Sequence, residues 1–183
     1  MKPVIYVVAA VALVGISLRV AFMRGPGALS VHRDDSRQVL SCNADNARKA
    51  LIVYQPVGNG RTNAVADKMG ETVRGKGYDV EMNVPGDFLP KDLSAYSLVA
   101  FGSPVYAGQV STVLTDYMKS VKGLPKDRVV IFSVGGVVDE GPELSALKQA
   151  LNGVEPGLAI KFNVGKEDSN ASKYAKVATL ASN

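Results

Sequence analysis

Cysteine and histidine are nearly absent from this chain of 183 residues, which contains one of each, Cys42 and His32. A single cysteine excludes an internal disulfide framework and a metal site built from several cysteines. Both residues precede residue 49, so we expect neither a Cys–His pair nor a histidine-based triad in the part of the chain that follows. Catalysis and metal binding that depend on cysteine or histidine are therefore not expected in this part of the chain.

Clustered positive charge is also lacking in the main part of the chain. Residues 1–48 contain six Lys/Arg against three Asp/Glu, a net charge of +3, whereas residues 49–183 contain fifteen against fourteen, a net charge of +1. A nucleic-acid-binding domain would need Lys and Arg gathered on one face, so we expect no nucleic-acid partner. Hydrophobic residues make up 46% of the chain, which is enough for the core of one ordinary domain.

An uncharged apolar run opens the chain. Residues 3–18 carry no charge, and the run continues beyond Arg19 to Met23. An arginine near the end of a helix can reach the membrane interface, so about twenty residues are available to cross a bilayer. We therefore expect a transmembrane signal-anchor at residues 1–24, with a cleaved signal peptide as the alternative.

Residues 25–48, which follow this run, are polar and contain two glycines and a proline near their start. Such a composition predicts a flexible linker before a domain at residues 49–183. Positive charge is heavier at the end of the apolar run and beyond it than before it, where Lys2 stands alone. This asymmetry favours a single-pass membrane-anchored protein whose domain is cytoplasmic and which contacts the membrane through its N-terminal helix.

Strand and helix patterns alternate from residue 49 onward. Short apolar or alternating runs predict strands, and apolar residues at helical spacing predict helices between them. The expected strands are residues 50–54, 78–84, 98–101, 129–132 and 158–164, and the expected helices begin near Thr62, Ser111, Leu144 and Tyr174, the last one being short. Residues 85–96 are too short and too broken for a full helix, so we expect one abbreviated crossover.

Strands separated by helices predict a parallel sheet with helices on both faces. The first, third and fourth strands are continuous apolar runs, as central strands buried on both faces are, whereas the second and fifth alternate in polarity as edge strands do. This pattern fits the order 2-1-3-4-5 in a doubly wound, five-stranded parallel α/β fold of three layers. An incomplete Rossmann half is the alternative that the pattern leaves open.

Loops at the carboxyl ends of the first, third and fourth strands are expected to form a ligand site. In the glycine-rich first loop, backbone N–H groups, Arg61 and Thr62 suit a phosphate, although a plain turn capped by Thr62 is equally compatible. In the second loop, the flat face of Tyr106 suits a planar ring unless it packs on the loop beneath. The third loop offers Gly135 and Gly136, which leave room beside a ligand, and acids that we interpret as helix-start residues.

The second loop reads Gly102-Ser103-Pro104-Val105-Tyr106-Ala107-Gly108, and with it residues 49–182 resemble the flavodoxin-like family. The strand end at Tyr54 and the Gly135–Gly136 turn are also similar to that family. The resemblance implies FMN as the cofactor, with its phosphate at the first loop and its isoalloxazine ring near Tyr106. The residues that it implies for FMN binding are Gln55, Val57, Gly58, Asn59, Gly60, Arg61, Thr62, Asn63, Ser103, Pro104, Val105, Tyr106, Ala107, Gly108, Gly135 and Gly136.

Two features depart from that family. Thr62 is the only hydroxyl residue of a phosphate loop that is usually rich in Ser and Thr, and the domain is nearly neutral where electron-carrier flavodoxins are acidic. Together with the expected membrane anchor, the resemblance implies an FMN-binding redox protein that transfers electrons at the membrane surface to an unidentified partner protein or small acceptor, without a catalytic side chain. Two alternatives stay open. One is a small FMN-dependent NAD(P)H:quinone-type reductase, and the other is a non-enzymatic interaction or regulatory module with a degenerate FMN site.

Overall fold

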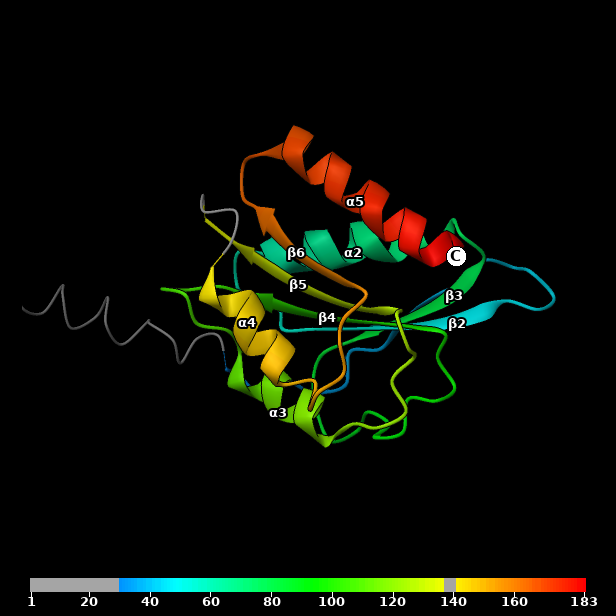
Figure 1. Ribbon diagram of the computed structural model, residues 1–183, viewed down its shortest axis with the longest axis horizontal. Coiled ribbons are helices and arrows are strands. Elements are labelled where there is room, and N and C mark those ends of the chain that lie inside the picture. The colour runs from blue at the N-terminus through cyan, green and yellow to red at the C-terminus, as the bar shows by residue number, and fades with distance from the viewer. Residues whose placement is uncertain (1–29, 137–140) are drawn as a thin grey trace, which may run out of the picture.

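A six-stranded, mostly parallel sheet runs through the domain, with helices on both of its faces (Figure 1). The computed structural model describes residues 30–136 and 141–183, apart from the side chains of residues 167 and 168. The strands are β1 (Gln38–Leu40), β2 (Arg48–Tyr54), β3 (Tyr78–Asn83), β4 (Leu98–Pro104), β5 (Val129–Gly135) and β6 (Leu158–Asn163). The helices described are α2 (Arg61–Arg74), α3 (Thr112–Ser120), α4 (Pro142–Gln149) and α5 (Glu167–Ser182).

The strands lie in the order β1-β3-β2-β4-β5-β6. Five of these strands, β3-β2-β4-β5-β6, pair in parallel. This is the predicted order 2-1-3-4-5, so the doubly wound topology is confirmed. The predicted number of strands is wrong, because β1 adds an antiparallel sixth strand beside β3. The abbreviated crossover is confirmed, since residues 84–97 form no helix.

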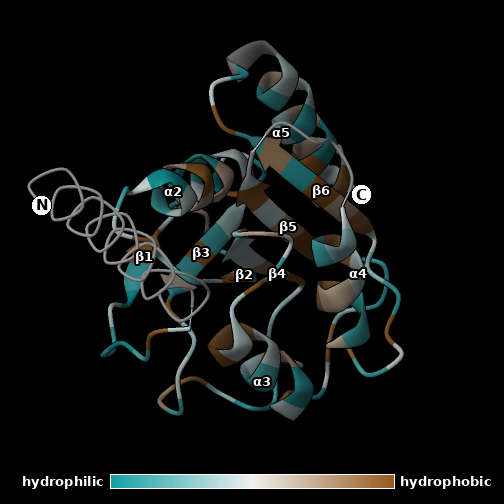
Figure 2. Cartoon of the chain, turned by 90° about the vertical axis from the view of Figure 1, so that its left-hand side faces the viewer, coloured by the Kyte–Doolittle hydropathy of each residue, from teal (hydrophilic) through white to brown (hydrophobic). Residues whose placement is uncertain are grey.

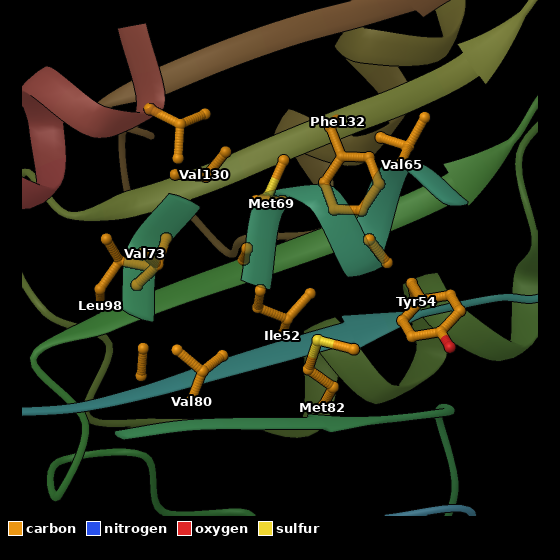
Figure 3. Close-up of a cluster of buried hydrophobic side chains, with 14 of the residues drawn as sticks. Ile52, Tyr54, Val65, Met69, Val73, Val80, Met82, Leu98, Val130 and Phe132 are labelled. Carbon is orange, nitrogen blue, oxygen red and sulfur yellow. The ribbon is translucent and has the colours of Figure 1, made fainter. Parts of the chain in front are cut away.

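Two apolar clusters separate the sheet from the helices on either face. On one face, Val65, Met69 and Val73 of α2 pack against Ile52 of β2 and Phe132 of β5 (Figure 3). α5 covers the same face beside α2, whereas α3 and α4 cover the other face (Figure 1). The central strands are therefore buried on both sides, as their continuous apolar runs predicted.

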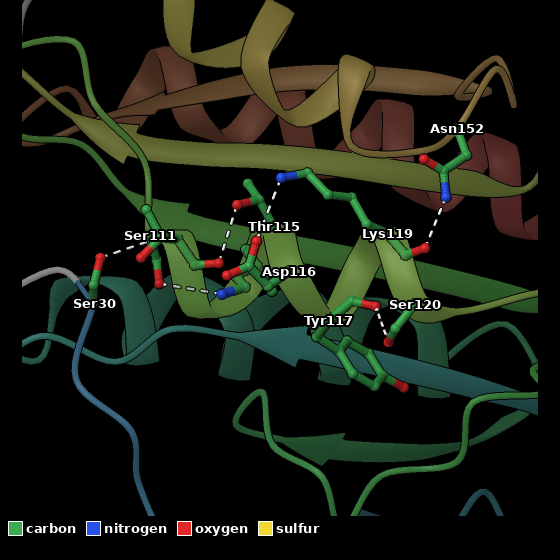
Figure 4. A network of polar contacts seen from close by, with 10 residues as sticks. Ser30, Ser111, Thr115, Asp116, Tyr117, Lys119, Ser120 and Asn152 are labelled. Atoms are coloured by element: carbon green, nitrogen blue, oxygen red, sulfur yellow. Dashed lines mark hydrogen bonds and ion pairs between the residues drawn. The ribbon is translucent and has the colours of Figure 1, made fainter.

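Helix α3 begins where the sequence predicted. Ser111 Oγ accepts a hydrogen bond from the Leu114 N–H at 3.3 Å, and the N–H of Thr112 donates to Ser30 Oγ at 3.1 Å (Figure 4). Tyr117 lies on the buried face of α3, where its hydroxyl donates to the Pro90 carbonyl at 2.8 Å, and burial raises the pKa of this phenol. The start of α3 is thus tied both to its own first turn and to the N-terminal segment.

Helix α5 is longer than predicted. It has 16 residues, of which only the second half carries the apolar spacing that marked it in the sequence. Its first half is fixed by polar contacts instead, since the Asn163 N–H donates to Asn170 Oδ1 at 3.1 Å and Asn170 Nδ2 donates to the Asn163 carbonyl at 2.9 Å. Hydrophobic periodicity alone cannot indicate a helix start that is held in this way.

Part of the stretch predicted to be a flexible linker lies along β3 and extends the sheet. Alternate polar side chains of β3 hold it there. The hydrogen bonds are donated by Ser41 Oγ and Cys42 N to Asp79 (2.9 Å each), by Arg37 to Glu81 (3.1 Å) and by Ser36 N to Asn83 (3.1 Å). The alternation that suggested an exposed edge strand therefore marks a strand whose polar side binds another segment, and β1 covers the edge of β3.

Asp79 makes one contact of this segment that depends on pH. Its pKa is lowered chiefly by the hydrogen bond from the Cys42 N–H, and then by the one from the Ser41 hydroxyl. A carboxyl whose pKa is lower in the folded state stabilises the fold fully at pH values above its unfolded-state pKa of about 3.9. This stabilisation is lost as the pH falls through the folded-state pKa. We predict that the amide resonances of residues 38–42 shift as the pH falls below about 4, and that Asp79→Ala produces the same shift at neutral pH.

Asp87→Ala is the matched control, because Asp87 pairs with the exposed Lys91 at 3.4 Å and makes no described contact with β1. It should leave the resonances of residues 38–42 unchanged. Unaltered resonances in Asp79→Ala would show instead that strand pairing alone holds the segment.

The predicted single-pass membrane location has to be corrected. In the parts of the chain that the structure describes, no helix combines the length and the apolar character needed to cross a membrane. The longest of them, α5, has 16 residues and would span about 24 Å, short of a hydrocarbon core of roughly 30 Å. The segment at residues 1–24, on which the prediction rested, lies outside the described residues.

Candidate functional site

The carboxyl ends of the parallel strands lie at one edge of the sheet, which faces the viewer in Figure 2. The loops at this edge enclose a cleft of about 420 Å³. Its lining comes from the ends of β4 and β5, the start of α2 and the loops after four strands: Val57, Asn59, Arg61, Thr62, Pro104, Val105, Tyr106, Val134, Gly135, Gly136 and Val164. Among these residues Arg61 alone is charged, so the cleft as described favours an anionic ligand over a cationic one.

The loop after β2 leads into the N-terminus of α2, which has no side-chain cap. Gly60 takes a left-handed conformation with a φ of 69°, which glycine adopts without strain. Asn59 Oδ1 accepts a hydrogen bond from the Arg61 N–H at 3.2 Å. Thr62 Oγ1 is buried and has no hydrogen-bond partner within the described residues. A helix start with an adjacent arginine and an unpaired hydroxyl is suited to bind a phosphate.

The loop after β4 turns tightly at its tip. The N–H groups of Tyr106 and Gln109 donate to each other's carbonyl oxygens, at 3.2 and 3.0 Å. Between them, Ala107 and Gly108 have positive φ values of 50° and 76°, as in type I′ turns. Tyr106 is thereby left 50% exposed in the wall of the cleft. The exposed part of its side chain can contact a planar ligand.

The loop after β5 is held against the loop after β4. The Val105 N–H donates to the Val134 carbonyl at 2.9 Å, and a Cβ added at Gly135 would lie 3.1 Å from the Val105 Cβ. A Cβ added at Gly136 would meet nothing within 4 Å among the described residues, so Gly136 borders open space. The two glycines therefore differ in role, because Gly135 allows the loops to meet and Gly136 leaves room for a ligand. Asp139 and Glu140, interpreted as helix-start acids, lie outside the described residues.

Two residues of the lining, Val134 and Val164, are not among those predicted from the sequence. Val164 follows β6, and its N–H donates to the Gly135 carbonyl at 3.1 Å. The rule that pointed to the first three loops would have found this one, because β6 runs parallel to β5 and ends at the same edge. A second cleft of about 440 Å³ adjoins the first between α2 and α5 and shares Arg61, Val134 and Val164 with it.

Gln55 and Ser103, both predicted to bind the cofactor, lie beneath the cleft and are fully buried. Gln55 Nε2 donates to the Val31 carbonyl at 3.1 Å, and Gln55 Oε1 accepts from Ser111 Oγ at 3.1 Å. Ser103 Oγ accepts from the Ser111 N–H at 2.9 Å. Both side chains thus have internal partners, as buried polar groups usually do, and their contact with a ligand stays a prediction. They join the N-terminal segment to the bases of two ligand loops.

Five further predicted residues shape the loops without lining the cleft. They are Gly58, Gly60, Asn63, Ala107 and Gly108. Gly58 and Gly60 have open space where a Cβ would project, and Asn63 Oδ1 is buried without a hydrogen-bond partner in the described chain. The first loop therefore keeps room and an unpaired acceptor beside the start of α2.

Tyr54 and Asp67 are titratable groups close to this loop. Burial raises the pKa of the Tyr54 phenol, and the negative charge of Asp67 raises it further. Burial also raises the pKa of Asp67. The phenol therefore stays neutral at physiological pH and brings no negative charge toward an anion at Arg61.

The buried position of Gln55 predicts how a substitution acts. Gln55→Leu should lower the free energy of unfolding by about 1–3 kcal/mol, because the Val31 carbonyl and the Ser111 hydroxyl lose a buried partner. The midpoint of urea denaturation measures this loss. Gln149→Leu, at an exposed position at the end of α4, is the control and should leave the midpoint within error. An unchanged midpoint in Gln55→Leu would show that these hydrogen bonds do not stabilise the fold.

Residues 51–182 match a family model described as the flavodoxin domain. No match was found among curated proteins. The family match covers almost the whole of the chain from β2 to α5.

Solved structures share the fold at low sequence identity. A flavodoxin from Megasphaera elsdenii has a TM-score of 0.57 and 22% identity, over 73% of this chain and 98% of that chain. A flavodoxin from the domain Archaea has a TM-score of 0.51 and 18% identity, over 74% and 99%. A flavodiiron core from Synechocystis has a TM-score of 0.55 and 14% identity, over 75% of this chain but 36% of that chain. At these identities the likeness shows the fold alone.

Proposed function

Because this chain belongs to the flavodoxin domain family, we propose that it binds FMN in the cleft at the carboxyl edge and transfers electrons to a partner protein or small acceptor. The observation that supports this proposal best is the polarity of the cleft. Arg61, the one charged residue of the described lining, lies at the start of α2 with the Thr62 hydroxyl, which has no partner among the described residues, and an exposed tyrosine lies on another loop. An anionic group and a flat ring in one ligand suit this arrangement.

The phosphate end would be held at the start of α2. The first N–H groups of a helix have no intrahelical acceptor, and the helix dipole favours negative charge beside them. Thr62 Oγ1 would donate the hydrogen bond for which the described protein offers no acceptor, and Arg61 would add a full positive charge. These groups would replace the hydroxyl groups with which the loop of this family usually binds the phosphate.

The ring would be held between the second and third loops. Tyr106 would stack on it, and Gly136 would let the backbone come close. When bound, the flavin supplies the electron-transfer chemistry, and the protein tunes it through its contacts. The chain's own residues bind and orient the ring and shield it from water, and none of the described lining residues is a carboxylate or an imidazole that would move a proton.

A reductase that passes electrons from NAD(P)H to a quinone is a second candidate. The observation that favours it is the cleft of about 440 Å³ between α2 and α5, which adjoins the first and offers space for another reactant. A protein of this kind would oxidise NAD(P)H continuously in the presence of a quinone, whereas a carrier would not.

A flavin titration of the full chain tests the proposal. We expect the purified protein to be yellow, or to quench the fluorescence of added FMN with a saturable, one-to-one isotherm. A colourless protein that leaves FMN fluorescence unchanged would favour the third candidate, a flavodoxin fold used only for interaction or regulation. Steady-state oxidation of NAD(P)H with a quinone then separates the reductase from the carrier.

Tyr106→Ala tests the position of the ring. Loss of an aromatic stacking partner is worth about 1 kcal/mol, so the Kd for FMN should rise about five- to tenfold. Phe88→Ala is the matched control, because Phe88 is similarly exposed (42% against 50%) but does not line the cleft. Equal effects of the two substitutions would argue against stacking on Tyr106.

Thr62→Val tests the position of the phosphate. A hydrogen bond to a charged group is worth about 1.5–3 kcal/mol, so the Kd for FMN should rise about 10- to 100-fold. The Kd for riboflavin, which lacks the phosphate, should not change. Without ligand, the variant should be as stable as the parent chain or more stable, because it removes a buried hydroxyl that has no partner in the described protein. A variant that loses stability but keeps its FMN affinity would place the phosphate elsewhere.

A further inference from the structure

Lys161 and Glu143 form an ion pair that is buried directly below the ligand loops. Lys161 Nζ lies 2.6 Å from Glu143 Oε1, and their side chains are 6% and 1% exposed. Each of the other ion pairs in the described chain has at least one well-exposed partner. Lys161 lies on β6 and Glu143 in the first turn of α4, so the pair fixes the start of this helix to the sheet.

The residues around the ion pair leave space for it and offer it no other charged partner in the described part of the neighbouring strands. Ser133 on β5, which lies opposite Lys161 in the strand register, places its hydroxyl 3.5 Å from Glu143 Oε1. Gly141, just before α4, must lack a side chain, because a Cβ there would collide with the Glu143 carboxylate. The described residues of β5 carry no charge, and Lys161 is the only charged residue of β6. The carboxylate and the ammonium therefore depend on each other.

Contacts lead from this pair to both loops that would hold the ring. Pro142, next to Glu143, lies beside the Tyr106 turn, since a Cβ added at Gly108 would be 3.4 Å from Pro142 Cγ. On the other side, a Cβ added at Gly135 would be 3.8 Å from Lys161 Cε. The ion pair thus lies below the point where the second and third loops meet.

Stability alone does not explain such a pair. Burying two charges costs desolvation energy that their attraction repays only in good geometry, and apolar residues of similar volume are often at least as stabilising. A buried ion pair fixes the orientation of one element relative to another, which an apolar contact does not. The direction fixed here is that of the start of α4 relative to β6.

We propose that Lys161 and Glu143 are positioning residues, which hold Pro142 against the Tyr106 turn and so set the ring side of the FMN cleft. The assignment of FMN rests on the proposed function, but the positioning of the turn does not. Neither residue touches the ligand in this proposal. Their effect is carried by the backbone of α4 and by the two loops above it.

Hydrogen exchange on the flavin-free full chain tests the positioning directly. In Lys161→Met, the amides of Val105 and Gln109, which donate to Val134 and Tyr106, should exchange at least about tenfold faster, while the Ile52 amide in the core stays slow. Lys148→Met is the matched control, because Lys148 lies on α4, the helix of Glu143, and pairs with Glu155 at 2.7 Å in an exposed position. This control should leave the exchange rates of the Val105 and Gln109 amides unchanged. Unchanged exchange at Val105 and Gln109 in Lys161→Met would overturn the proposal.

The double variant Lys161→Met/Glu143→Leu separates positioning from packing. It leaves no buried charge unpaired, so it should fold even if Lys161→Met does not. We expect the stability of the parent chain but still the fast exchange at Val105 and Gln109, because an apolar contact does not fix the direction of α4. Restored slow exchange would reduce the pair to a space-filling role and overturn the proposal.

Flavin binding completes the test. The Kd values for FMN and riboflavin should rise by the same factor, about tenfold, in both variants, because the ring side is disturbed and the phosphate side is not. The visible circular dichroism of the bound flavin should change as well, since it reports how the ring lies against its neighbours. A selective loss of FMN over riboflavin would contradict the assignment to the ring side. If the parent chain binds no flavin, the proposed function fails, and the exchange experiment still decides the positioning.

Discussion

Burial of β2, β4 and β5 on both faces is the physical constraint on which the rest of the domain depends. Strands of this kind carry apolar side chains above and below, and their backbone groups are paired within the sheet. Helices must then cover both faces, and polar side chains can gather only where the strands end. The carboxyl edge becomes the place for a ligand because the interior of the sheet offers none.

The polar groups at this edge divide into two sets according to burial. Gln55, Ser103 and Ser111 are satisfied by one another and by the N-terminal segment, so they hold the loops together. Arg61 and Thr62 remain available to the cleft. The first polar residue of the loop after β2, Gln55, is thus committed to the scaffold. An anion bound as proposed would rely on the helix start, one hydroxyl and one arginine.

β3 and β6, the two strands with alternating polarity, show that the polar residues of such a strand are not always exposed to solvent. Asp79 and Glu81 of β3 bind the segment that contains β1, which turns an apparent edge into an inner strand. Lys161 of β6 is buried and pairs with Glu143. In both strands the polar side meets a partner supplied by a distant part of the chain.

Hydrophobic periodicity in the sequence determined the parallel strands, their order and the loops that meet at the carboxyl edge, because periodicity is local and reports which side of an element is buried. Only the tertiary structure decided that β1 joins the sheet, that Gln55 supports the cleft from below and that Lys161 is paired. Each of these depends on a partner outside the element. Gln55 and Ser111, for example, are 56 residues apart, and no local pattern records which distant groups a fold brings within hydrogen-bonding distance.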